Sequence, residues 1–220
     1  MAKSFPNTGA TVIDTVADLP AASGALEGVM MFQKDTNELK ICDGSSWISM
    51  LDTDTPPGMQ LVASNSFSSA SSVNIDNIFS ASFINYRLLI NITSASGGGS
   101  LNFYMRNGTT SIITDYQWNL QTQEGSSAPT GNSGTGTSGI LGYCGYSGGG
   151  QWGTTQADIF SPFEAAWTKT LSTSTGVTAG GAGATLSGGT WHKLSTSYNG
   201  ILFFVPSVTI TGTYRLYGYR

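Results

Sequence analysis

Short segments of alternating polar and apolar residues recur along most of the chain. The alternation is clearest over residues 86–92 and 101–106, where one face is apolar and the other carries Arg, Asn or Tyr. This period of two predicts half-buried antiparallel strands. Strand candidates after residue 58 cover 59–63, 72–75, 86–93, 100–106, 116–123, 140–146, 156–160, 167–171, 191–194, 200–205, 208–210 and 214–219. No amphipathic helical pattern accompanies them, so we expect an all-β, antiparallel jelly roll or β-sandwich.

The first 58 residues follow a different pattern. Residues 1–28 contain the turn residues Pro6, Asn7, Gly9, Pro20, Gly24 and Gly28 and predict extended chain. A compact three-stranded meander is predicted to follow over 29–33, 39–43 and 47–50. A meander of this size is marginal alone, so we expect it to pack against a partner or a second copy. Residues 52–58 contain Pro56 and Pro57 and no apolar side chain, which predicts a linker. The predicted domains are therefore 1–58 and 59–220.

Two low-complexity segments interrupt the strand pattern. Residues 124–139 and 176–189 consist almost wholly of Gly, Ser, Thr and Ala. Uninterrupted segments of this length are typical of functional or disordered loops. We expect both to form long loops at one end of the sandwich.

Composition adds a strong bias against helices and against nucleic acid as a partner. Only 10% of the residues are charged and 29 are Gly, whereas a typical domain has roughly 25% charged residues. The net charge is −4, and no two basic residues are adjacent, so a phosphate-binding surface is not expected. Residues 1–58 contain eight acidic and three basic residues (net −5), while residues 59–220 contain five and six (net +1). This asymmetry predicts different roles for the two parts.

The cysteines and the hydrophobic runs argue against disulfide-rich, zinc-binding, secreted and membrane-spanning proteins. Cys42 and Cys144 are too few for a disulfide framework or a zinc site, and we expect two separate buried thiols. The start of the chain lacks an apolar signal-peptide core, and no apolar run approaches the length of a membrane span. We expect synthesis in a cytoplasm and no membrane insertion.

Motifs that could carry chemistry are weak. Residues 134–139 match G-x-G-x-x-G, but a strand-like segment follows where a dinucleotide site needs a helix. His192, the only histidine, has no nearby carboxylate partner in sequence and is expected on a strand surface. Asp158 and Glu164 are the only plausible acid pair for a glycoside hydrolase. We expect no enzyme, no catalytic residue, no cofactor and no metal site.

One segment combines aromatic residues with glycines. Tyr143, Tyr146 and Trp152 lie among four glycines within residues 143–152. Exposed aromatics on such loops stack on sugars or anchor protein contacts, so these three are candidate receptor or glycan contacts. The alternative is that the tyrosines belong to the core and Trp152 closes the end of the sandwich.

Two segments resemble structural proteins of bacteriophage virions, in particular tail fibres of marine or cyanobacterial phages. The first includes Ala-Asp-Leu-Pro at 17–20, Asp-Thr-Asn-Glu-Leu at 35–39 and Asp-Gly-Ser-Ser-Trp at 43–47. The second spans residues 67–106 and is completed by the ending Ile-Thr-Gly-Thr-Tyr-Arg-Leu-Tyr-Gly-Tyr-Arg at 210–220, which is similar to the last strand of phage jelly-roll domains. The resemblance covers about two thirds of the chain, and residues 124–139 and 176–189 lie outside it.

The resemblance implies a homotrimeric short tail fibre located in the virion. Residues 1–58 would dock on a tail or baseplate protein, with Phe5, Phe32 and Trp47 as anchors, and residues 59–220 would contact a host-surface glycan. A capsid decoration or head-fibre protein and a free carbohydrate-binding module are the alternatives. The position in the particle separates the first of these from a tail fibre, and a monomeric state would favour the second.

Overall fold

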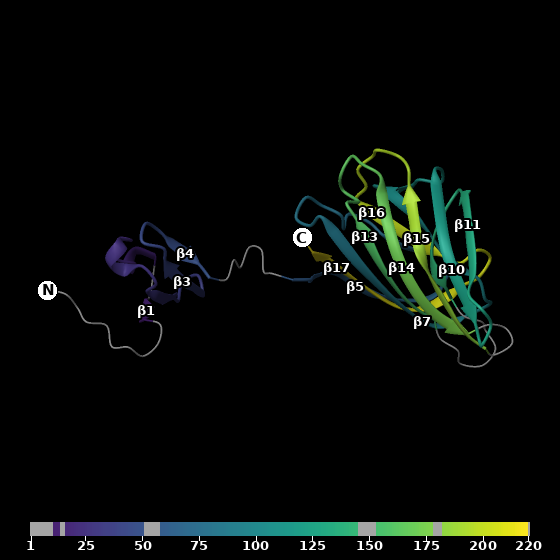
Figure 1. Cartoon of the computed structure of the whole chain (residues 1–220), viewed down its shortest axis with the longest axis horizontal. Coiled ribbons are helices and arrows are strands. Elements are labelled where there is room, and N and C mark those ends of the chain that lie inside the picture. Colours follow the sequence, from purple (N-terminus) through teal and green to yellow (C-terminus); the bar gives the residue numbers. More distant parts are fainter. Residues whose placement is uncertain (1–10, 14–15, 51–57, 145–152, 178–181, 220) are drawn as a thin grey trace. The chain divides into compact units, whose positions relative to one another are not determined.

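A computed structural model describes residues 11–13, 16–50, 58–144, 153–177 and 182–219 (Figure 1). The described residues form strands, two short 3-10 turns and connections, with no α-helix among them. The expected all-β, antiparallel architecture is confirmed. The chain divides into two compact units, Met1–Gly58 and Met59–Arg220, which we call the first and second units.

The first unit contains a four-stranded sheet in the order β1-β2-β3-β4. The expected meander is present as β2 (Met30–Gln33), β3 (Glu38–Cys42) and β4 (Trp47–Ser49). A parallel strand, β1 (Thr11–Ile13), is added at the edge beside β2, where the sequence indicated only extended chain. The 3-10 turns η1 (Val16–Asp18) and η2 (Gly24–Leu26) occupy the connection between β1 and β2.

The two faces of this small sheet differ. On one face Met31, Gln33 and Cys42 are buried. The Trp47 indole, also on that face, donates to the Pro20 carbonyl (2.8 Å), and the Cys42 thiol to the Ser23 carbonyl (3.8 Å). The chain at 20–23 therefore covers this face. The other face, the apolar face, carries the side chains of Met30, Phe32, Leu39, Ile41, Ile48 and Met50.

The second unit contains two antiparallel sheets. The larger has the order β11-β10-β15-β14-β13-β7-β17-β5. Its strands are β5 (Gln60–Ala70), β7 (Asn85–Ala95), β10 (Tyr116–Glu124), β11 (Thr130–Gly136), β13 (Gly153–Phe160), β14 (Thr168–Val177), β15 (Gly183–His192) and β17 (Ile210–Tyr219). The smaller has the order β12-β8-β16-β6, with β9 beside β8. Its strands are β6 (Val73–Ile75), β8 (Ser100–Asn107), β9 (Thr110–Ser111), β12 (Gly139–Tyr143) and β16 (Gly200–Phe204). Figure 1 shows the larger sheet curled.

The core lies between these sheets and is built from alternate residues of each strand. In β7 the inward positions are Tyr86, Leu88, Ile90 and Ile92, all at most 2% exposed. The facing strand β8 contributes Leu101, Phe103 and Met105. Burial of this many large apolar side chains is the main stabilisation of the unit, at roughly 25 cal/mol per Å² of apolar surface.

Where β14 lines the interior, the buried side chains carry hydroxyls. Thr168, Thr170, Ser172 and Ser174 are all at most 4% exposed. These inward positions of β14 are therefore hydroxyl-bearing, whereas those of β7 are apolar or aromatic. Two buried hydroxyls bind the backbone of the crossing strand β12. The Ser174 hydroxyl accepts from the Tyr143 amide at 2.9 Å, and the Thr190 hydroxyl on β15 donates to the Ile140 carbonyl at 3.1 Å. The hydroxyls of Thr168 and Ser172, in contrast, have no hydrogen-bond partner among the described residues.

The two predicted loops are wrong in large part. Residues 130–136 form β11, and β14 and β15 extend over much of 176–189. Glycines are accommodated because large groups occupy the space of the missing side chain. A Cβ at Gly134 would lie 2.6 Å from the Trp118 ring on β10, and one at Gly188 would lie 2.3 Å from the Asn119 carbonyl. Close packing, which the sequence pattern does not reveal, therefore overrides the low strand preference of glycine.

Candidate functional site

The outward face of the larger sheet carries two parallel rows of mainly polar side chains. Strand register aligns Thr175, Thr154, Asn91 and Thr213 in one row, across β14, β13, β7 and β17. The same register aligns Thr173, Gln156, Leu89 and Arg215 in the adjacent row. Because each strand contributes an i, i+2 pair, all eight side chains point to the same face.

These eight residues line a hollow of about 740 Å³, which we call the sheet groove. A second hollow of about 410 Å³ adjoins it at Thr173 and continues over β14, β15, β10 and β11, with Gln121, Ser187 and Asn119 in its lining. Neighbouring strands are ~4.8 Å apart, so the sheet groove alone crosses roughly 15 Å of sheet. The two hollows together form an elongated surface that runs across the strands.

The polar groups of the sheet groove are available to a ligand. Thr154 and Thr175 share a hydroxyl hydrogen bond of 2.8 Å. Within the part of the chain that the structure describes, no side-chain hydrogen bond engages Asn91, Gln156 or Arg215. Two amides and one guanidinium therefore offer both donors and acceptors from fixed strand positions. The lining of both hollows includes Arg215 and no carboxylate, so the local charge is positive on a chain whose net charge is −4.

An ion pair borders the groove on the same face. Arg87 binds Asp158 with two hydrogen bonds, from Nε (2.7 Å) and from an Nη (2.8 Å), and the Tyr219 hydroxyl donates to the same carboxylate at 3.3 Å. The hydrogen bond to Asp158 raises the pKa of Arg87. Asp158 is therefore neutralised, while Glu164 is exposed in the turn after β13. No contact in the described residues joins the two acids that the sequence offered as a hydrolase pair, and neither lines the sheet groove.

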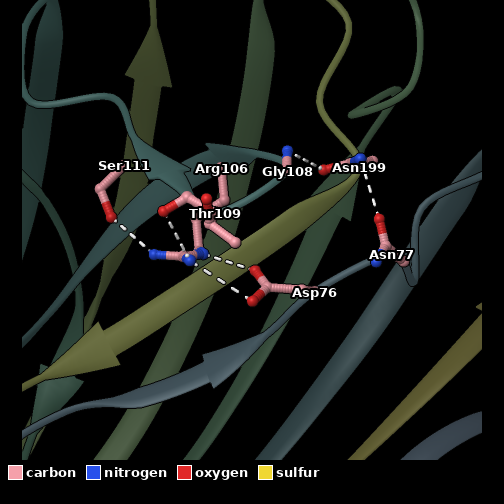
Figure 2. A network of polar contacts seen from close by, with 7 residues as sticks. All are labelled: Asp76, Asn77, Arg106, Gly108, Thr109, Ser111 and Asn199. Carbon is pink, nitrogen blue, oxygen red and sulfur yellow. Dashed lines mark hydrogen bonds and ion pairs between the residues drawn. The ribbon is translucent and has the colours of Figure 1, made fainter.

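A second polar cluster, around Arg106, is structural (Figure 2). The Arg106 guanidinium binds Asp76 (Nε to Oδ1, 2.5 Å), the Ser111 hydroxyl (2.8 Å) and the Thr109 carbonyl (2.9 Å). Asn199 extends the network by accepting from the Gly108 amide at 2.9 Å and donating to Asn77 at 3.1 Å. Arg106 is only 5% exposed and its donors are engaged. The cluster therefore fixes the β8–β9 hairpin against the chains beside it.

His192 is buried in the core, and the predicted strand-surface position is wrong. It is 1% exposed, its Nδ1 lies 2.8 Å from the Tyr198 hydroxyl, and its Nε2 lies 3.0 Å from the Thr114 carbonyl. Because a carbonyl only accepts, Nε2 carries the proton and Nδ1 accepts from Tyr198. Burial lowers the pKa of His192. Within the described residues its two ring nitrogens bond only a backbone carbonyl and a tyrosine hydroxyl, so this histidine joins three parts of the core.

The aromatic candidates are placed in part. Tyr143 is half-buried at the end of β12 and hydrogen-bonded through its amide to Ser174, while Tyr146 and Trp152 lie outside the described residues. Phe5 also lies outside them. Phe32 is half-buried on the apolar face of the first unit, whereas Trp47 points to the opposite face and bonds the Pro20 carbonyl. Phe32 and Trp47 are therefore on different faces of one sheet.

The remaining candidates behave as structural residues. Cys42 and Cys144 are two separate buried thiols, as expected. The G-x-G-x-x-G segment lies on β11 and in the turn before β12, so a strand follows it. Among the described residues no cluster of His, Cys, Asp or Glu is suited to a metal ion. No helix in the same residues is long and apolar enough to span a membrane.

Comparison of the chain with protein-family models, curated proteins and solved structures found no match. The function is therefore inferred from the geometry of the two units. The sheet groove was not predicted from the sequence, although its i, i+2 pairs are visible there: Leu89 with Asn91, Thr154 with Gln156, Thr173 with Thr175, and Thr213 with Arg215. Only the strand order brings these four pairs together.

Proposed function

We propose that the chain is a structural protein of a bacteriophage virion, a trimeric short tail fibre. In this proposal the first unit docks on a tail or baseplate protein and the second unit contacts glycans on the host surface. The resemblance of residues 17–47 and 210–220 to phage fibres supports this assignment. The alternatives, a head fibre or capsid decoration protein and a free carbohydrate-binding module, share the binding unit but differ in location or assembly.

The observation that carries the proposal is the apolar face of the first unit. Met30 is 43%, Ile48 49% and Met50 50% exposed, and all three lie on one face of a sheet with Phe32, Leu39 and Ile41. Soluble proteins rarely leave such a contiguous apolar surface uncovered unless it binds a partner. The surface belongs to a segment of net charge −5, so we expect a partner with an apolar centre and basic residues around it.

A charge placed on the apolar face tests the docking role. We expect Ile48→Lys to leave the chain folded and soluble, because Ile48 is half-exposed on an edge strand. It should nevertheless be missing from purified virions of a phage that encodes it, measured by mass spectrometry of the particles. Ala25→Lys on the exposed turn η2 is the matched control, because it adds the same charge away from this face. Equal incorporation of both variants would contradict the docking assignment.

The oligomeric state is tested separately by native mass spectrometry of the full chain. A trimer is expected from the resemblance to phage fibres, and three weakly binding copies would gain affinity for a repetitive surface through multivalency. A monomer would favour the free carbohydrate-binding module. If Ile48→Lys converts a trimer to a monomer, the apolar face joins copies of the chain and does not dock on the tail.

A further inference from the structure

We propose that the sheet groove binds an acidic polysaccharide, with Arg215 bound to a carboxylate of the sugar and Gln156 and Asn91 bound to its hydroxyls. This inference deepens the proposed host contact and rests on it. It assigns the contact to the outward face of β14, β13, β7 and β17, and not to the aromatic segment that the sequence suggested.

The shape of the surface favours a linear chain molecule. The sheet groove and the adjoining hollow share Thr173 and run across the strands, so several sugar units would lie in succession over different strands. Backbone atoms of β-strands are fixed by the ladder, and each row keeps its side chains in register. A ligand with repeating groups therefore meets a repeating set of hydroxyls and amides, as in the row Thr175, Thr154, Asn91 and Thr213.

The chemistry of the lining favours a sugar over a protein. Outward side chains of the sheet groove are four threonines, two amides, one leucine and one arginine, and a core of aromatic anchors that protein interfaces use is absent from these described residues. Amides and hydroxyls match sugar hydroxyls, each of which both donates and accepts. Leu89 supplies a small apolar contact for a ring face.

The charge indicates that the sugar is acidic. Arg215 is exposed and has no hydrogen-bond or ion-pair partner in the described chain, whereas the nearby Arg87 is neutralised by Asp158. Arginine forms two parallel hydrogen bonds with a carboxylate. Because the lining contains no acidic residue, no carboxylate of the lining competes with a uronic acid for Arg215.

The test compares a galacturonic acid oligosaccharide with the neutral galactose oligosaccharide of equal length. We expect the full chain to bind the acidic probe more tightly in calorimetric titrations at low ionic strength. Arg215→Gln should reduce affinity for the acidic probe about fivefold, because it removes a charge-assisted hydrogen-bond pair. Gln156→Ala should weaken binding of both probes to a similar extent, because an amide recognises hydroxyls that the two probes share.

Lys169→Gln is the matched control. Lys169 is an exposed cation on the same face of β14, outside the sheet groove, so its removal should change affinity less than twofold. Equal binding of the two probes, or equal losses for Arg215→Gln and Lys169→Gln, would overturn the proposal. A change in assembly mass caused by Gln156→Ala would also overturn it and identify the face as an interface between copies. Virion incorporation of Arg215→Gln is expected to be normal, which keeps this test separate from that of the docking role.

Discussion

Gly142 on β12 passes directly over Ser174 on β14. A Cβ at Gly142 would lie 2.5 Å from the Ser174 Cβ and 2.8 Å from the Thr155 hydroxyl, and the next residue, Tyr143, donates its amide to the Ser174 hydroxyl at 2.9 Å. Because Gly142 has no side chain, the two sheets approach each other closely at this point. The Ser174 hydroxyl gives the backbone of the edge strand β12 a hydrogen-bond partner there.

This contact predicts a destabilised Gly142→Ala variant. The added methyl group meets a packed interior on two sides, so we expect the free energy of unfolding to fall by about 1–3 kcal/mol. Thermal or urea denaturation followed by circular dichroism measures the change. Gly183→Ala, at the start of β15 with nothing within 4 Å of the added Cβ, should be close to wild type. If both variants lost similar amounts of unfolding free energy, the cause would be a general intolerance of alanine at glycine positions and not the contact between Gly142 and Ser174.

The same contact explains how far the sequence could predict the fold. Strands with one apolar face, such as β7 and β8, follow from alternation because the core they face is apolar. β14 also alternates between buried and exposed residues, but its buried side chains are hydroxyls, so polarity does not reveal its inward face. The sequence predicts loops at Gly134 and Gly188, because the groups that occupy their empty space are distant in sequence. These groups, the Trp118 ring and the Asn119 carbonyl, come from β10. The sheet groove escaped prediction for a related reason, since it exists only through the register of four strands.

The Arg106 cluster predicts unequal effects of two similar substitutions. Arg106→Gln removes a buried cation from Asp76, Ser111 and the Thr109 carbonyl. The Asp76 side chain is 30% exposed and can be partly rehydrated, so we expect a loss of about 2–4 kcal/mol in the free energy of unfolding, toward the lower part of the range for broken buried pairs.

Arg87→Gln is the comparison for this prediction, because Arg87 forms the same kind of pair with Asp158 but is 31% exposed. The Asp158 side chain is only 14% exposed, but it keeps the Tyr219 hydroxyl as a donor when Arg87 is replaced. A pair whose cation is this accessible to solvent contributes less than one whose cation is buried, so we expect a loss of about 1–2 kcal/mol. Chemical denaturation of both variants therefore should rank Arg106→Gln as the more damaging. An equal or reversed order would contradict the structural role of the cluster. Asp76→Asn, which keeps a hydrogen-bond acceptor for the arginine, should be intermediate.

Burial of His192 predicts a stability that falls below neutral pH. Its ring contacts Tyr116 and Tyr198, with Asp115 the nearby acidic group, and burial holds its pKa below the ordinary value of 6.5. The unfolded chain therefore binds a proton at a higher pH than the folded one. The contribution to stability is fully present above pH 6.5 and is lost as the pH falls through 6.5 toward the lower folded pKa, at up to roughly 1.4 kcal/mol per pH unit.

His192→Gln separates this effect from other titrations. The glutamine amide can donate to the Thr114 carbonyl and its carbonyl can accept from Tyr198, yet it does not titrate. The variant should be less stable than wild type at pH 7.5, because the ring packing is lost, but its melting temperature should change less between pH 7 and pH 5. Parallel pH profiles for the two proteins would mean that acidic side chains, and not the buried imidazole, govern stability in this interval. The imidazole ring links β10, β15 and residue 198, so its protonation should loosen the end of the sandwich where these segments meet.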